Sequence, residues 1–181
     1  MEFYKYPLAK LFDIPQIVTI HYFEYGKDFI FEGESHDFWE FLCVDKGEVT
    51  VTAGSHGYTL EKGSIIFHKP RQFHSVATNG SIAPNLVVIS FVCHSPAMQF
   101  FEDKILRLEE TERSLLAAIL SEAGDAFLTP LDNPYTSQLF GNPRQCPGAE
   151  QMIQLSLEHF LISLYRKGTM PTVGKQLTKS I

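Results

Sequence analysis

The chain has 181 residues, 44% of them hydrophobic, which is enough for one domain of ordinary size with a complete core. Its formal net charge is −6 and its pI is about 5.6, so the chain by itself lacks the basic surface that binding to nucleic acid requires. The longest apolar run covers only residues 86–93, which is too short to span a bilayer, and no signal peptide is visible after Met1.

The first half of the chain is typical of a series of short strands. Apolar stretches, many of them alternating with polar residues, are separated by turn signals such as Lys46-Gly47 and Asn79-Gly80. The predicted strands cover residues 16–25, 29–31, 37–44, 48–53, 58–60, 64–68, 73–78 and 86–93. Short strands at this spacing predict a mainly β fold, an antiparallel sandwich or barrel.

The pattern becomes helical after residue 95. Ser95-Pro96 predicts a short helix that ends at Phe101, and a second helix is expected over residues 110–126. The third helix, over residues 148–166, is apolar on so much of its circumference that we expect it to be buried on two sides, one of them against a second copy of the chain. The side chains predicted for this dimer interface are Ile153, Leu157, Phe160, Leu161 and Leu164.

Two later segments lack a periodic pattern. Residues 128–147 contain four prolines and predict a long loop that is either a packed wrapper or mobile. The tail after residue 166 is polar and contains Gly168, Pro171 and Gly174, which predicts a linker. We therefore expect three parts: a barrel with an N-terminal arm (1–95), a helical dimerisation segment packed on it (96–166), and a linker (167–181).

Two polar clusters in the strand region form the candidate site. If one strand continues through residues 34–44, alternation places Glu34, His36, Phe38 and Glu40 on one face. His74 lies on a second strand whose inward face can oppose the first. These side chains can then meet in the interior of the sheet.

The chemistry of this cluster leaves alternatives open. His36, Glu40 and His74 could bind a divalent metal through nitrogen and oxygen ligands. They could equally hydrogen-bond the hydroxyls of a small polar ligand, with Phe38 and Phe73 as an apolar wall. A third interpretation is that they are satisfied polar residues at the barrel mouth with no ligand. We favour ligand binding and expect no cofactor.

Two neighbouring residues have a sharp and a plain interpretation. Arg71 lies in a turn beside His74, where it either binds an acidic group of the ligand or is a solvated turn residue. Trp39 falls on the odd-numbered face with Phe41 and Cys43, and we expect it in the core beneath the helices rather than as a stacking platform for a sugar.

The order and spacing of these residues resemble the cupin motifs. Glu34-x-His36-x3-Glu40-x6-Gly47 follows the first cupin motif, with Glu34 in place of its first histidine, and Gly63 and His74 match the second motif. This resemblance covers roughly residues 16–93 and implies a cupin-like antiparallel β-barrel of the jelly-roll type, followed here by two or three helices. A stand-alone cupin enzyme would use a metal here for isomerase, dioxygenase or lyase chemistry.

A finer pattern resembles the amino-terminal sensor domain of AraC-family transcription regulators. It consists of residues 36–41, Gly47-Glu48, residues 63–67 and residues 70–75, followed by the helices predicted after the barrel. The resemblance implies a small-molecule effector, such as a sugar, in the barrel, and an aromatic arm at residues 3–7 that can close over it. The plainer interpretation of this arm is loose terminal residues packed on the surface. The resemblance also implies a homodimer through the last helix, and contact with DNA only through a domain of two helix-turn-helix units that is absent from this chain.

We therefore expect an effector-sensing and dimerisation domain without enzymatic activity and without membrane contact. The alternatives are a metal-dependent cupin enzyme and a carbohydrate-binding module without regulation. The three cysteines form no metal or redox motif, which fits a reducing cytoplasm. The predicted ligand-binding residues are Glu34, His36, Phe38, Glu40, Arg71 and His74.

Overall fold

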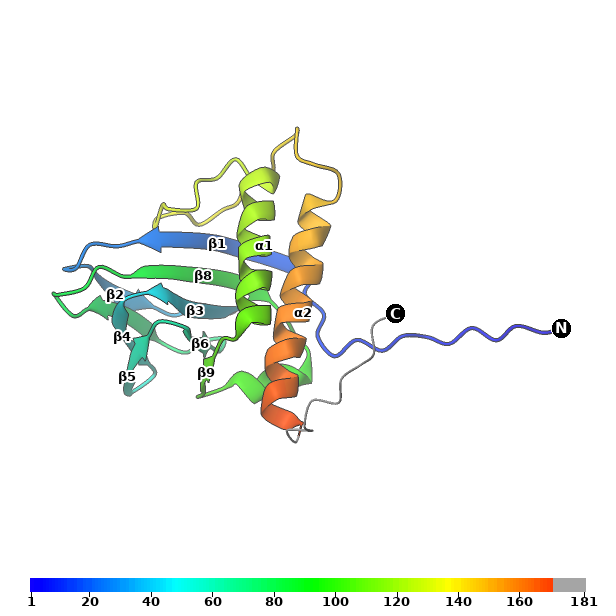
Figure 1. Cartoon of the computed structure of the whole chain (residues 1–181), viewed down its shortest axis with the longest axis horizontal. Helices are drawn as coiled ribbons and strands as arrows, with labels where there is room; N and C mark the ends of the chain where they lie inside the picture. The colour runs from blue at the N-terminus through cyan, green and yellow to red at the C-terminus, as the bar shows by residue number, and fades with distance from the viewer. Residues whose placement is uncertain (171–181) are drawn as a thin grey trace.

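The computed structural model describes residues 1–170, which form two antiparallel sheets and a helical layer (Figure 1). The strands are β1 (Gln16–Glu24), β2 (Ile30–Glu34), β3 (Trp39–Lys46), β4 (Glu48–Ala53), β5 (His56–Glu61), β6 (Ser64–His68), β7 (His74–Thr78), β8 (Asn85–Val92) and β9 (Ile105–Arg107). The helices are the 3-10 helix η1 (Pro96–Phe101) and the α-helices α1 (Glu110–Ala126) and α2 (Ala149–Thr169).

The strands are divided between two sheets that pack face to face. One sheet has the order β1-β8-β3-β6-β9 and the other the order β2-β7-β4-β5, with antiparallel pairing between the neighbours. Within the described residues the two sheets do not close into one barrel. The fold is therefore the expected cupin-like jelly roll followed by helices, in the form of an open sandwich.

The five-stranded sheet is buried on both faces, and this divides the core in two. On β3, Trp39, Phe41 and Cys43 belong to the cluster that also contains the buried side chains of α1 and α2. Leu42 and Val44 alternate with them and pack against the four-stranded sheet. The prediction that Trp39 packs beneath the helices is confirmed, and it leaves no ring face free for a sugar.

The two long helices lie side by side across the five-stranded sheet (Figure 1). The five side chains predicted to form the dimer interface (Ile153, Leu157, Phe160, Leu161 and Leu164) are all at most 1% exposed within the single chain. That prediction is wrong, because these residues pack against the sheet and α1 and cannot reach a second copy. The apolar pattern marked the buried face of α2 correctly but not the element that covers it.

Both ends of the helical region differ slightly from expectation. Ser95 precedes η1, but its hydroxyl accepts the backbone N–H of Asp13 (3.0 Å) and makes no capping bond. The helix α2 continues to Thr169, so residues 167–169 of the predicted linker are helical, and residues 171–181 of it lie outside the described part. Lys167, in the last turn of α2, pairs with Glu112 at the start of α1 (2.8 Å). Strand β9, which has only three residues, was not predicted.

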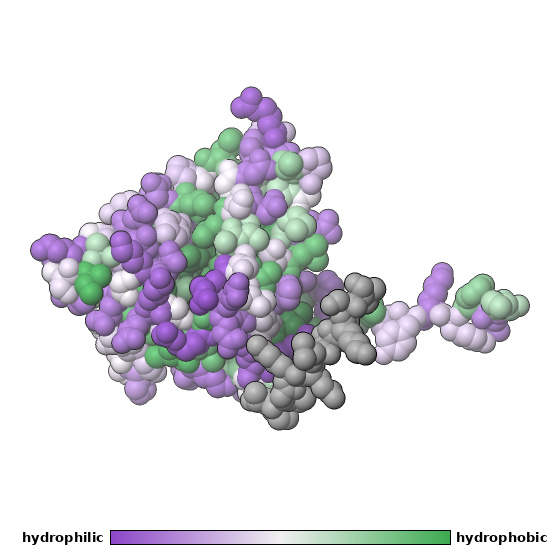
Figure 2. Space-filling model, viewed as in Figure 1, coloured by the Kyte–Doolittle hydropathy of each residue, from purple (hydrophilic) through white to green (hydrophobic). Residues whose placement is uncertain are grey.

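The two irregular segments behave differently. The loop between α1 and α2 is held at several points, for example by the Tyr22 N–H on the carbonyl of Leu131 (2.9 Å) and the Leu128 N–H on the carbonyl of Phe140 (2.8 Å). These contacts favour the interpretation of the loop as a packed wrapper. The N-terminal arm instead extends away from the body, with Phe3 and Tyr4 each more than 80% exposed (Figures 1 and 2).

The surface of the helical layer is mixed in character. In Figure 2 apolar residues, shown in green, interrupt the hydrophilic surface over this layer. Among the described helices, none is both long enough and apolar enough to cross a membrane.

Candidate functional site

A cavity of about 470 Å³ lies between the two sheets. The five-stranded sheet contributes side chains of β1, β3 and β8 to its wall, and the four-stranded sheet contributes side chains of β2 and β7. Part of the loop before α2, residues 134–137, completes the wall. The lining residues are Val18, Thr19, His21, Phe23, Tyr25, Phe29, Phe31, Glu34, Phe38, Glu40, Leu42, His74, Val76, Leu86, Val88, Ser90, Pro134, Tyr135, Thr136 and Ser137.

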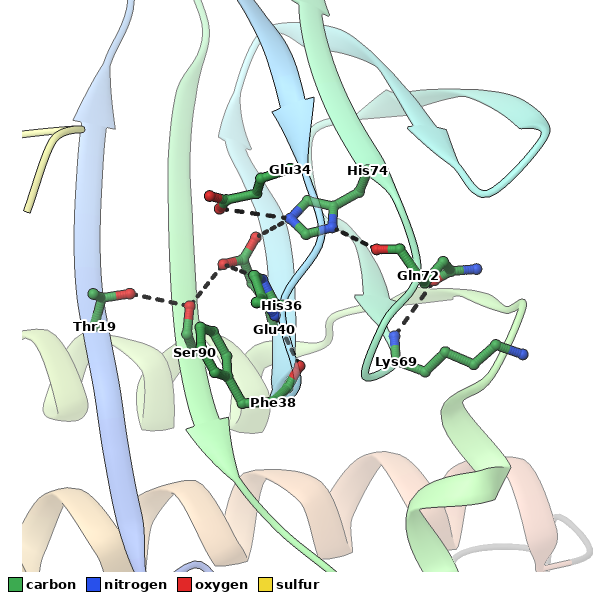
Figure 3. Close-up of polar contacts among 9 residues, drawn as sticks. All are labelled: Thr19, Glu34, His36, Phe38, Glu40, Lys69, Gln72, His74 and Ser90. Atoms are coloured by element: carbon green, nitrogen blue, oxygen red, sulfur yellow. Dashed lines mark hydrogen bonds and ion pairs between the residues drawn. The ribbon is translucent and has the colours of Figure 1, made fainter. Parts of the chain in front are cut away.

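Glu40 is the centre of the polar end of this cavity (Figure 3). Its side chain is buried, and its two carboxylate oxygens lie 3.3 Å from Nε2 of His74 and 3.6 Å from Nε2 of His36. The hydroxyl of Ser90 donates a hydrogen bond to Glu40 (2.6 Å), and the hydroxyl of Thr19 donates to Ser90 (3.0 Å). Four elements of the fold therefore hold one carboxylate in place.

The predicted convergence is present, but not through one continuous strand. Strand β2 ends at Glu34, which pairs with His74 on β7, and Nε2 of His74 lies 3.8 Å from the Glu34 carboxylate. The chain then crosses to the other sheet, where Glu40 lies on β3. His36 and Phe38 belong to this crossing, with their rings stacked 3.8 Å apart. The side chains meet because the two sheets face each other, not because they share one strand face.

Backbone carbonyls orient both imidazoles of the cluster. Nδ1 of His36 lies 3.0 Å from the carbonyl of Phe38, and Nδ1 of His74 lies 3.1 Å from the carbonyl of Gln72. Because a carbonyl only accepts, each Nδ1 carries the proton and the lone pair of a neutral ring lies on Nε2, toward Glu40. Neither Nε2 has a hydrogen-bond partner within the described residues. This arrangement of electron-rich atoms is stabilised by a positive charge, supplied either by a proton or by a metal ion.

The electrostatics of the site follow from burial and from these contacts. Burial opposes the charged forms of His74 and Glu40, but polar contacts outweigh it. Contact with Glu40 raises the pKa of His74, and contacts with His36, His74 and Ser90 lower the pKa of Glu40. His68 is a further buried histidine, with its ring stacked on His74 at 4.3 Å and both nitrogens without a partner in the described chain. Burial lowers the pKa of His68 to about 3, so this ring is neutral.

The four polar residues fit a divalent metal ion. Glu34, His36, Glu40 and His74 each offer a ligand atom, and these atoms all lie within 4.8 Å of one another. Bonds of about 2.1 Å in a tetrahedral site place ligand atoms about 3.4 Å apart, and three of the measured separations are 3.3, 3.6 and 3.8 Å. The Nδ1–H bonds to carbonyls are also the usual support of metal-binding histidines. Glu34 thereby completes the set that His36, Glu40 and His74 alone would leave at three.

The structure does not bring every predicted residue to the cavity. Arg71 is exposed, does not line the cavity, and adopts a positive φ of 66° while its backbone N–H donates to the carbonyl of His36 (2.6 Å). His36 contacts Glu40 but is not itself a lining residue. Glu34, Phe38, Glu40 and His74 do line it.

Sequence reasoning missed most of the apolar wall and several polar residues, namely Thr19, His21, Ser90 and His68. His68 lies opposite Glu40 in the β3–β6 pairing, and only the strand order reveals this. The aromatic residues Phe23, Tyr25, Phe29 and Phe31 come from β1, β2 and the turn between them. Their alternation within a predicted strand was a usable signal for an inward face, but it did not show which cavity that face would line.

Comparison with known proteins agrees with this architecture. Residues 17–84 match the family model of the AraC-like ligand binding domain. An apo ToxT variant from Vibrio cholerae is 13% identical with a TM-score of 0.52, and the match covers 82% of this chain and 55% of that chain. A Schizosaccharomyces pombe Cnp3 cupin domain is 15% identical with a TM-score of 0.41, over 46% of this chain and 59% of that chain.

The likeness to the ToxT structure, at 13% identity, concerns the fold alone. The chain spans somewhat more than half of each of these two structures. No curated protein sequence matches the chain significantly. Residues 17–84, which include strands β2 to β7, are thus similar to the AraC-like ligand binding domain.

Proposed function

We propose that this chain is the effector-sensing part of a bacterial AraC-type transcription regulator and that a small molecule binds between its two sheets. The observation that supports this most directly is the cavity of about 470 Å³, which has apolar walls and one convergent polar end. Its volume lies within the range of about 300–1,000 Å³ that is common for small-molecule sites. The family match covers most of its lining strands.

The same cavity offers a route from binding to a change elsewhere in the protein. Residues 134–137 line it and belong to the loop that leads directly into α2. A ligand that contacts this loop and both sheets binds more tightly to the arrangement in which those contacts are closest. Such a difference in affinity is the only way in which a ligand can shift a conformational balance.

We place the proposed homodimer on the exposed face of α2 instead of its buried face. Met152, Leu155, His159, Ile162 and Arg166 follow one another at spacings of three and four residues, as in the seam of a coiled coil. Met152 is 46% exposed and Leu155 is 51% exposed in the single chain. This set is called the α2 stripe below. Contact with DNA through a domain outside this chain, and a cytoplasmic location, stay predictions.

A cavity-filling variant tests the binding proposal. In a thermal-shift screen of small molecules, compounds that raise the melting temperature of the wild type should lose this effect in Val18→Trp, since Val18 is a half-buried lining residue. Thr50→Trp introduces the same side chain at an exposed position of β4 and is the matched control. Compounds that stabilise the wild type and Val18→Trp equally would place the binding site elsewhere.

The metal-compatible cluster supports a second candidate, a metal-dependent cupin enzyme. The observation in its favour is that Glu34, His36, Glu40 and His74 bring ligand atoms to metal-like separations. A bound divalent ion would polarise a carbonyl group or activate water. Metal analysis of purified protein tests the site: about one ion per chain, lost in His74→Ala and kept in the exposed-site control His56→Ala, supports it. A metal content far below one ion per chain after reconstitution would reject this candidate.

A further inference from the structure

One wall of the cavity is a continuous stack of aromatic rings. His21 and Phe23 lie on one face of β1, and Tyr25 follows at the same two-residue spacing. The ring centroids are 4.6 Å apart for His21 and Phe23, 4.7 Å for Phe23 and Tyr25, and 3.5 Å for Tyr25 and Phe29, with interplanar angles of 19°, 22° and 8°. All four side chains line the cavity. We call this wall the aromatic ladder.

The ladder presents ring edges to the cavity, because neighbouring rings cover each other's faces. The hydrogen-bearing edge of an aromatic ring carries the positive part of its quadrupole, and its preferred partner is the negative face of another ring. A flat aromatic molecule can therefore lie with its face against the ladder. A sugar ring stacks on an exposed aromatic face, and within the ladder these faces are occupied.

The rest of the cavity wall is aliphatic, both beside the ladder on the same sheet and opposite it, so the body of the occupant must be apolar. Leu42, Leu86 and Val88 lie on β3 and β8 in the same sheet as β1, and Val76 faces them from β7; all four offer only aliphatic surface. Polar side chains of the strands gather instead at the end that contains Glu40. A sugar has hydroxyls around its whole rim, and several of them would be buried against these walls without partners.

The polar end is rich in hydrogen-bond acceptors. The raised pKa of His74 favours a positive charge on this ring, but the Glu40 carboxylate, 3.3 Å away, already pairs with it. No lysine or arginine lines the cavity in the described part of the chain. Glu34 and Glu40 bring carboxylates, while the protons of the Ser90 and Thr19 hydroxyls are already donated to Glu40 and Ser90. A ligand group that donates, such as a hydroxyl or an ammonium, is therefore complementary to this end, and a carboxylate or phosphate is repelled.

We propose that the effector is a flat, largely apolar aromatic molecule with a single hydrogen-bond-donating end, not a sugar and not an organic acid. Its ring lies against the aromatic ladder, and its hydroxyl or ammonium group meets Glu40 and Glu34. This assignment rests on the proposed function, because it names the chemical class of the molecule bound in the same cavity.

Matched probes test the class directly. Phenethylamine, 2-phenylethanol, phenylacetate and glucose are compared by ligand-observed NMR at millimolar concentration, on chelator-treated protein so that no metal occupies the polar cluster. The amine and the alcohol should bind at least about tenfold more tightly than phenylacetate or glucose, which corresponds to about 1.4 kcal/mol. Phe23→Leu should weaken the binding of phenethylamine and 2-phenylethanol. Phe73→Leu, which changes an exposed ring outside the cavity, should not weaken it.

The outcomes separate this inference from the function on which it rests. Binding of glucose that Val18→Trp abolishes would overturn the aromatic class while the cavity remains a ligand site. Equal binding of phenylacetate and phenethylamine would overturn the donating end. Failure of every aryl probe to bind would overturn the class as a whole. Aryl binding that survives in Val18→Trp would reject both this inference and the proposed function.

Discussion

Two leucines of α2 provide a sharp test of which face of this helix is core. Leu157 is fully buried, whereas Leu155, two residues earlier, is 51% exposed and belongs to the α2 stripe. Leu157→Ala removes apolar atoms from a filled core and leaves a cavity, which costs about 2–5 kcal/mol. Leu155→Ala removes a side chain that is already half in water, so its cost should be less than about 1 kcal/mol.

The expected difference is large compared with the stability of a domain. Total unfolding free energies are about 5–15 kcal/mol, and in a chain of this size 1 kcal/mol changes the melting temperature by about 2–4 °C. Leu157→Ala should therefore melt roughly 5–15 °C below the wild type, and Leu155→Ala within about 3 °C of it. Urea unfolding followed by circular dichroism measures both free energies.

The molecular mass completes the test. If the α2 stripe forms the dimer, Leu155→Glu buries an unpaired charge and should yield a monomer by light scattering, while folded Leu157→Ala keeps the mass of the wild type. Equal stability of the two alanine variants would refute the packing argument for α2. A dimer that persists in Leu155→Glu would remove the α2 stripe as its interface.

Three further predictions concern stability. Burial lowers the pKa of His68 to about 3, so from about pH 6.5 down to about pH 3 only the unfolded chain gains this proton, and the loss of stability at about pH 5 is about 2 kcal/mol. In urea titrations, His68→Leu should therefore lose less stability than the wild type between about pH 7 and about pH 5. An equal loss in the two proteins would count against this role of His68. Gly33→Ala should destabilise by at least about 2 kcal/mol, because φ is 115° and the new β-carbon would lie 2.6 Å from the carbonyl oxygen of His74; a wild-type melting temperature would contradict this. Glu112→Ala should cost about 2–4 kcal/mol, because the buried carboxylate accepts from the backbone N–H of Glu109 (2.7 Å) and from Lys167 (2.8 Å). A free energy of urea unfolding equal to that of the wild type would refute the role of these contacts.

Local pattern determined much of the secondary structure. Strands 48–53 and 64–68 and helices 96–101 and 110–126 have the predicted bounds, because turn glycines, proline and periodicity act within a few residues. The three-residue strand β9 has no period of its own and exists because β6 offers it a free edge. The loop before α2 is likewise held by contacts with β1 and with its own two ends, which no local signal encodes.

For the candidate site, spacing indicated the polar residues but not their surroundings. The sequence indicated that Glu34, His36, Glu40 and His74 could meet, and in the structure their side chains do converge. The crossing between sheets, the stacking of His68 on His74 and the aromatic ladder depend on which strands become neighbours. Strand order is set by the burial of the whole chain, so residues far apart in sequence cannot be assigned to one cavity from their own neighbourhoods.

The helix α2 shows the same division most clearly. Its sequence alone determined that a long helix forms near the end of the chain and that apolar residues surround most of it. Only the tertiary structure decided that the face with Leu157 is covered by the sheet and α1, and that the face with Leu155 stays accessible. The reason is physical: apolar surface is driven from water without preference for a particular partner, so which face is covered follows from the arrangement of the layers.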